Sequence, residues 1–118
     1  FVLKHMNGMI DEAFAKQLRL EEMFENAEKM FKIAKEAFDN EDTAMAEQVF
    51  GIDNLIDEIN HGAIPILAQQ IRKDAEKTEE YLYLHHVIRK IERIGDRCNN
   101  IAEETVFFLD AKVLKHSK

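Results

Sequence analysis

The sequence has little of several residue types on which other classes of protein depend. Only one of its 118 residues is cysteine, so no disulfide can form within the chain, and a reducing compartment is expected. One proline and four glycines are too few turn-forming residues for a fold of many short strands. No apolar run approaches the roughly 18 residues that a membrane-spanning helix needs. These absences leave a small helical domain as the expected class.

Basic residues are also in the minority. The 16 Lys and Arg residues are outnumbered by 23 Asp and Glu residues, which gives a net charge of −7. No nucleic-acid partner is expected, because phosphate backbones are bound by dense Lys and Arg surfaces. An excess of carboxylates is common in proteins, and it also suits a protein that collects cations.

Three long segments repeat apolar residues in alternating steps of four and three, which is the period of packed helices. They cover residues 17–38, 43–73 and 79–109, and short polar turns separate them. Long helices joined by short connections pack against each other in antiparallel order. The sequence therefore predicts an all-α fold, an antiparallel three-helix bundle.

Some details of these helices are also predicted. Pro65 indicates a kink or a break near Asn60 and His61, because proline removes a backbone hydrogen bond and clashes with the carbonyl four residues earlier. The basic tail, residues 111–118, is expected to fray. The first helix has these expected core positions: Leu20, Phe24, Ala27, Phe31, Ala34 and Phe38.

The start of the chain looks like the end of another unit. Residues 1–8 close with Asn7-Gly8, a strong helix breaker, and are expected to be the end of a preceding helix or a linker. The bundle domain then takes residues 9–118. The chain opens inside an apolar pattern and without a signal peptide, so it is expected to begin within a longer protein.

Two of the expected helices each carry two carboxylates four residues apart. These are Asp53 with Asp57, and Glu92 with Asp96. Residues four apart share a helix face, and each of these acids directly follows a core position, so all four lie on matching flanks. Reflection through the turn near residue 75 places the two pairs within roughly 5 Å of the same height. The pairs should therefore face each other across one groove.

Four converging carboxylates predict a metal site. Carboxylate oxygens favour cations such as magnesium, manganese, iron or zinc. The candidate accessory ligands are Asn99, Asn100 and His61, and the small Gly95 would let the two helices approach closely.

An alternative for the acids is a surface charge cluster. Arg89 and Arg93 each precede one of the acids by three residues, so local ion pairs can neutralise Glu92 and Asp96. A second alternative is a di-metal carboxylate oxidase, which would use a Glu-x-x-His motif such as Glu58 with His61. A second motif of that kind is missing from the sequence. No nucleophile–base set or glycine-rich phosphate loop supports catalysis either.

Longer runs around the acid pairs resemble a known family. The run IERIGDRCNNIAE, residues 91–103, resembles the C-terminal repeat of the PhoU family of phosphate-uptake regulators. Residues 37–59, AFDNEDTAMAEQVFGIDNLIDEI, are similar to the first hairpin of that repeat. Proteins of this family contain two similar three-helix bundles, and in some members acidic E/D-x-x-x-D motifs bind metal clusters. The resemblance implies the same role for these four residues: Asp53, Asp57, Glu92 and Asp96.

The resemblance also implies a function. It implies a cytoplasmic regulator that is not an enzyme and that holds phosphate-starvation signalling off when phosphate is plentiful. The implied partners are a sensor histidine kinase and the ATPase subunit of a phosphate ABC transporter. The protein would then be peripheral to the membrane at most. The resemblance also allows a homodimer. Similar domains occur in some sodium–phosphate and potassium transporters, so a regulatory transporter domain is the alternative.

Overall fold

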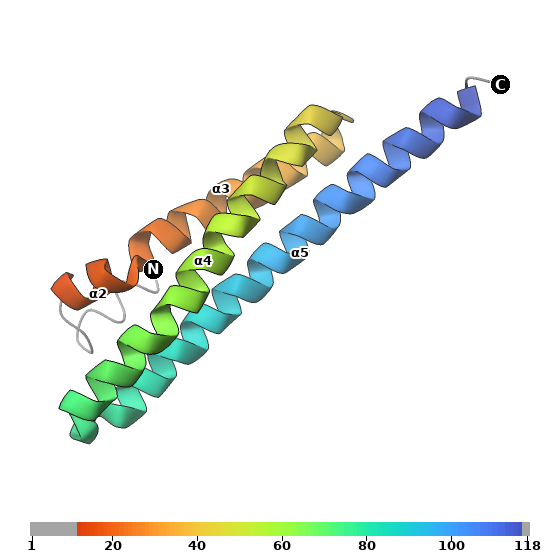
Figure 1. Ribbon diagram of the computed structural model, residues 1–118. Helices are drawn as coiled ribbons and strands as arrows, with labels where there is room; N and C mark the ends of the chain where they lie inside the picture. Colours follow the sequence, from red (N-terminus) through yellow and green to blue (C-terminus); the bar gives the residue numbers. More distant parts are fainter. Residues whose placement is uncertain (1–11, 117–118) are drawn as a thin grey trace.

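The computed structural model describes residues 12–116, and every regular element in that part of the chain is helical (Figure 1). The three long helices lie side by side, as Figure 1 shows. The predicted all-α bundle of three long helices is confirmed, but the helix predicted over residues 17–38 is interrupted at Arg19, whose φ of 63° is left-handed and cannot continue a right-handed helix. The short α2 packs against α3 and α4. The elements are α2 (Glu12–Leu18), α3 (Leu20–Asp39), α4 (Thr43–Lys73), the 3-10 turn η1 (Ala75–Lys77) and α5 (Thr78–His116). The linker predicted at residues 1–8 lies outside the described residues.

α4 begins and ends at the predicted residues, and it continues unbroken through Pro65. The predicted break near Asn60 and His61 is therefore wrong. Pro65 is exposed, so its ring does not disturb the core, while Ala63 and Leu67 on either side of it stay buried. Packing of the buried face holds the helix together across the missing backbone hydrogen bond.

The start of α4 is fixed by a side-chain cap. The carboxylate of Asp42 accepts a hydrogen bond from the backbone N–H of Met45 at 3.0 Å. We expect Asp42→Ala to lower the free energy of unfolding by about 1 kcal/mol, because that N–H loses its acceptor. Urea denaturation measures the change, and Asp39→Ala, at an exposed acid at the end of α3, is the control with an expected change below about 0.5 kcal/mol. Equal losses in both variants would contradict the cap.

The core of α3 differs from the prediction. Phe31 and Phe38 are 55% and 61% exposed, and their predicted core positions are wrong. The buried positions of α3 are Leu20, Met23, Ala27, Met30, Ala34 and Ala37. α3 packs against both α4 and α5, and the small alanine and flexible methionine side chains let it approach both helices closely.

The C-terminal tail is more ordered than predicted. α5 is helical as far as His116, so the predicted fraying is wrong for residues 111–116. Figure 1 shows α5 running past the turn between α3 and α4. At that turn the ammonium group of Lys112 lies 3.1 Å from a carboxylate oxygen of Glu41, which ties the last turns of α5 to the bundle. None of the helices within the described residues is long and apolar enough to cross a membrane.

Candidate metal centre

The groove between α4 and α5 brings three carboxylates together. One oxygen from each of Asp53, Asp57 and Asp96 lies within 4.8 Å of the other two. Asp53 and Asp57 are half-buried on α4, whereas Asp96 is exposed on α5. The two acid pairs therefore face each other, because the antiparallel helices bring the same flank of each into contact.

Glu92, the fourth predicted ligand, is not among these three close carboxylates. Burial raises the pKa of its carboxyl group, and the neighbouring Asp96 and Asp57 carboxylates and a hydrogen bond to Asp96 raise it further. The guanidinium group of Arg89 opposes this shift. Glu92 is thus electrostatically coupled to the cluster.

The surroundings of Asp53 disfavour its ionised form. Burial, followed by the negative charges of Asp57, Asp96, Glu92 and Glu103, raises its pKa from 3.8 to about 6. Its Oδ1 atom is buried and accepts no hydrogen bond. A buried carboxylate oxygen without a donor costs free energy, and a bound cation would remove that cost. The residues present therefore fit a metal ion.

The backbone of Gly95 lies against the Asp53 carboxylate. A Cβ atom at Gly95 would lie 3.4 Å from Oδ1 of Asp53 and 3.5 Å from the Ile56 side chain, both ordinary contact distances. The close approach of α4 and α5 that was expected at Gly95 is therefore a contact between the α5 backbone and the Asp53 side chain of α4.

The three candidate accessory ligands lie in different environments. The side-chain amide of Asn99 donates a hydrogen bond to Glu103 at 2.9 Å, whereas Asn100 is exposed. The ring Nδ1 of His61 is hydrogen-bonded at 2.9 Å to the backbone oxygen of Asp57. Glu103, whose charge also acts on Asp53, was not predicted as a site residue, although it lies seven residues after Asp96 and so on the same flank of α5.

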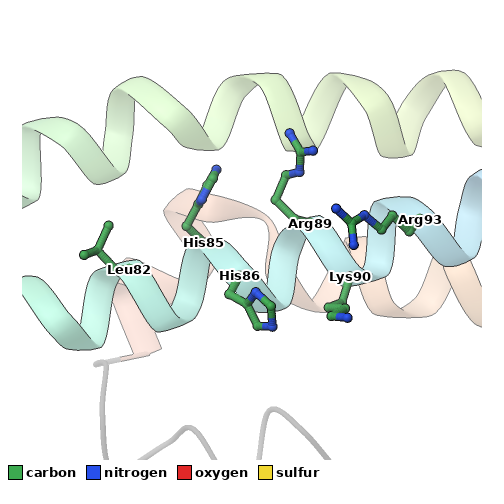
Figure 2. A pocket seen from close by; sticks show the side chains of 6 residues that line it. All are labelled: Leu82, His85, His86, Arg89, Lys90 and Arg93. Carbon is green, nitrogen blue, oxygen red and sulfur yellow. The ribbon is translucent and has the colours of Figure 1, made fainter.

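The ion pairs that would neutralise the acids do not form among the described residues. Arg89 and Arg93 make no salt bridge there, and instead they line a hollow of about 340 Å³ with other basic side chains. Figure 2 shows His85 and Arg89 pointing toward one side of α5, and His86 and Lys90 toward the other. The adjacent histidines diverge, as two successive helical residues must.

The Glu-x-x-His motif does not join the carboxylate cluster. Glu58 lies 4.0 Å from the guanidinium group of Arg19, and both Glu58 and His61 are exposed. The arrangement of the described residues therefore does not favour the di-metal oxidase.

The chain resembles known proteins across most of its length, and residues 20–105 match the PhoU domain family. A phosphate-specific transport system accessory protein PhoU homolog from Thermotoga maritima is 31% identical over 96 residues, which are 81% of this chain and 41% of that protein. A Burkholderia homolog is 30% identical over 74% of the chain and 37% of its own length. The Escherichia coli PhoU protein is 27% identical over 82% of the chain and 40% of its own. The chain spans about two fifths of the length of these relatives. No solved structure matches it significantly.

Proposed function

The chain belongs to the PhoU family, and we propose on that premise that it is an accessory regulator of phosphate transport. The names of its relatives state an accessory role in the phosphate-specific transport system. In this proposal the chain is a cytoplasmic adaptor without enzymatic activity. Its partners are a sensor histidine kinase and the ATPase subunit of a phosphate ABC transporter, and through them it keeps phosphate-starvation signalling off.

The observation that supports a metal-dependent regulator is the unpaired buried oxygen of Asp53 within the carboxylate groove. Asp53, Asp57 and Asp96 would hold the ion, with Glu92 beside them. The ion would be iron, manganese, magnesium or zinc, which all accept carboxylate oxygens. Its positive charge would offset the repulsion between the acids and link α4 to α5. The surface offered to a partner would then be fixed by the metal.

Elemental analysis of the purified protein tests the metal site. We expect near-stoichiometric metal in the wild type and at least a tenfold lower content in Asp57→Ala and Asp96→Ala, since each loses one of three close ligands. Asp39→Ala, at an exposed acid at the end of α3, is the matched control and should keep its metal. Equally low metal in the wild type and all variants would make the groove a surface charge cluster.

A reporter of phosphate starvation tests the regulatory role. The protein is expressed in bacteria that lack their own PhoU protein. We expect the reporter to be repressed again at high phosphate, and less so with the Asp57→Ala and Asp96→Ala substitutions. A reporter that stays fully active with the wild-type protein would contradict the role in phosphate signalling, whatever the metal content.

A further inference from the structure

A row of basic side chains covers the outward side of α5. Residues 85–97 contain 6 of the 21 basic residues of the chain, which are 16 Lys and Arg plus 5 His. These six side chains, the basic row, are His85, His86, Arg89, Lys90, Arg93 and Arg97. His85 is half-buried, and the other five are exposed. A chain with a net charge of −7 thus concentrates positive charge on a short part of one helix.

The basic row points away from the core of the bundle. Ile88 and Ile91 mark the side of α5 that faces the core, since both are buried. At about 100° per residue, Arg93 lies about 140° around the helix from Ile88 and about 160° from Ile91. The middle of the row therefore faces solvent.

The side chains of the row form no ion pair within residues 12–116. His85 and Arg89 border the carboxylate groove, because each lies seven residues before one of its acids. Even so, no salt bridge or side-chain hydrogen bond of the described residues involves a member of the row. By contrast, Arg19, Lys32 and Lys112 each pair with a glutamate. The N–H groups of the row are thus available to a ligand.

Five members of the row surround a hollow on α5. With Leu82 they line a volume of about 340 Å³, and their side chains spread around the outward side of the helix (Figure 2). No acid lines this hollow. Its volume is that of roughly ten water molecules in the liquid, so it can hold more than one small ion. Because the lining offers cationic and imidazole N–H donors, the ligand that fits is an anion rich in acceptor oxygens.

The spacing of the charges favours a chain of phosphates over an acidic helix. Arg89, Lys90, Arg93 and Arg97 place four permanent charges within about 12 Å of helix length. An acidic helix presents carboxylates on one face about 6 Å apart, and so brings two or three to that length. The phosphates of a nucleic-acid strand are about 3.4 Å apart. In inorganic polyphosphate a single oxygen joins successive phosphates, so its charges are closer still, and guanidinium groups bind phosphate oxygens in pairs.

We propose that the basic row binds inorganic polyphosphate, a linear chain of phosphate groups, along the outward side of α5. Arg89 and Arg93 hold phosphate oxygens with their guanidinium groups, and Lys90 and Arg97 neutralise adjacent phosphates. This ligand goes beyond the proposed regulatory function and needs no metal ion. An anionic membrane fits less well, because a helix that lies in a lipid interface buries its apolar face there, whereas the apolar face of α5 is buried in the bundle.

Calorimetric titration of the protein with polyphosphate, in the presence of a chelator, tests the proposal. With four contacts, the affinity should fall roughly 50-fold between 50 and 200 mM salt, because a flexible polyanion loses about 0.7 in the logarithmic salt slope per contact. Arg89→Gln and Arg93→Gln together should weaken binding at least tenfold at low salt and reduce the salt effect to about sevenfold. Helix content by circular dichroism should stay unchanged, since both sites are exposed.

A matched variant separates the row from the net charge. Lys29→Gln and Lys35→Gln together remove the same charge from exposed sites on α3. The affinity should then change less than about threefold, because salt screens distant charges. Equal losses in the two double variants, or no binding of polyphosphate at low salt, overturns the proposal.

Other anions test the class of ligand. Orthophosphate, polyglutamate, oligothymidylate and vesicles of phosphatidylglycerol are compared with polyphosphate at equal concentrations of anionic groups. Each should bind at least tenfold more weakly, and any of them that binds as tightly overturns polyphosphate as the ligand. Elemental analysis of the Arg89→Gln, Arg93→Gln variant should show the metal content of the wild type. A failure of polyphosphate binding is therefore distinct from a failure of the proposed metal-dependent function.

Discussion

Asp53→Asn is expected to stabilise the metal-free protein at neutral pH and to remove its metal binding. The Asp53 carboxylate is half-buried among like charges, its Oδ1 has no hydrogen-bond donor, and its pKa is raised to about 6. The amide has no charge to repel its neighbours, so the free energy of unfolding should rise by on the order of 1–2 kcal/mol after allowance for partial exposure. The amide is also a poorer ligand than the carboxylate for a hard cation.

The change in stability and the loss of metal binding need separate measurements. Urea denaturation with a chelator at pH 7.5 gives the stability of the metal-free variants, and calorimetric titration with Mn²⁺ gives the affinity. We expect affinity to fall at least about 100-fold, compared with the 10–100-fold that loss of a supporting residue costs. Asp39→Asn, at an exposed acid remote from the groove, should change neither quantity. A less stable metal-free Asp53→Asn protein would show that the carboxylate is not strained.

The metal-free wild-type protein is expected to lose stability as the pH rises from 4 to 7.5. The pKa of Asp53 is about 6 in the folded protein and near 3.8 when unfolded, and the pKa of Glu92 is raised in the same direction. Between these values the folded state binds more protons, so its stability falls with rising pH and levels off above the folded pKa. The loss from Asp53 should be on the order of 2 kcal/mol.

Denaturation curves at several pH values with a chelator measure this loss. Asp53→Asn should flatten the curve, and a saturating metal ion should restore stability at pH 7.5 by about 2.7 kcal/mol when present at 100 times its Kd. Stability that instead rises from pH 5 to 7.5 in the chelated wild type would contradict the raised pKa values.

The sequence by itself determined the bounds of α4 and the meeting of Asp53, Asp57 and Asp96. Apolar steps of four and three placed α4 at its observed ends, and a fixed rise per residue brought Asp57 and Asp96 to one height. The helix ends follow from the local apolar periodicity, and the common height of the acids follows from the antiparallel direction of the two helices. Both properties can be read from a single sequence. The resemblance of residues 91–103 to the PhoU family is equally a property of the sequence and is confirmed by the family match.

Only the tertiary structure decided which face of α3 is buried and which acid is strained. Apolar residues at 23, 30 and 37 compete with those at 24, 31 and 38, and contact with both α4 and α5 selects the first set. The sequence does not distinguish the burial of the four acids, yet Asp53 is half-buried against Gly95 while Asp96 is exposed. Rotation of a helix about its axis and the burial of one carboxylate depend on contacts between helices, and helical periodicity alone does not specify them.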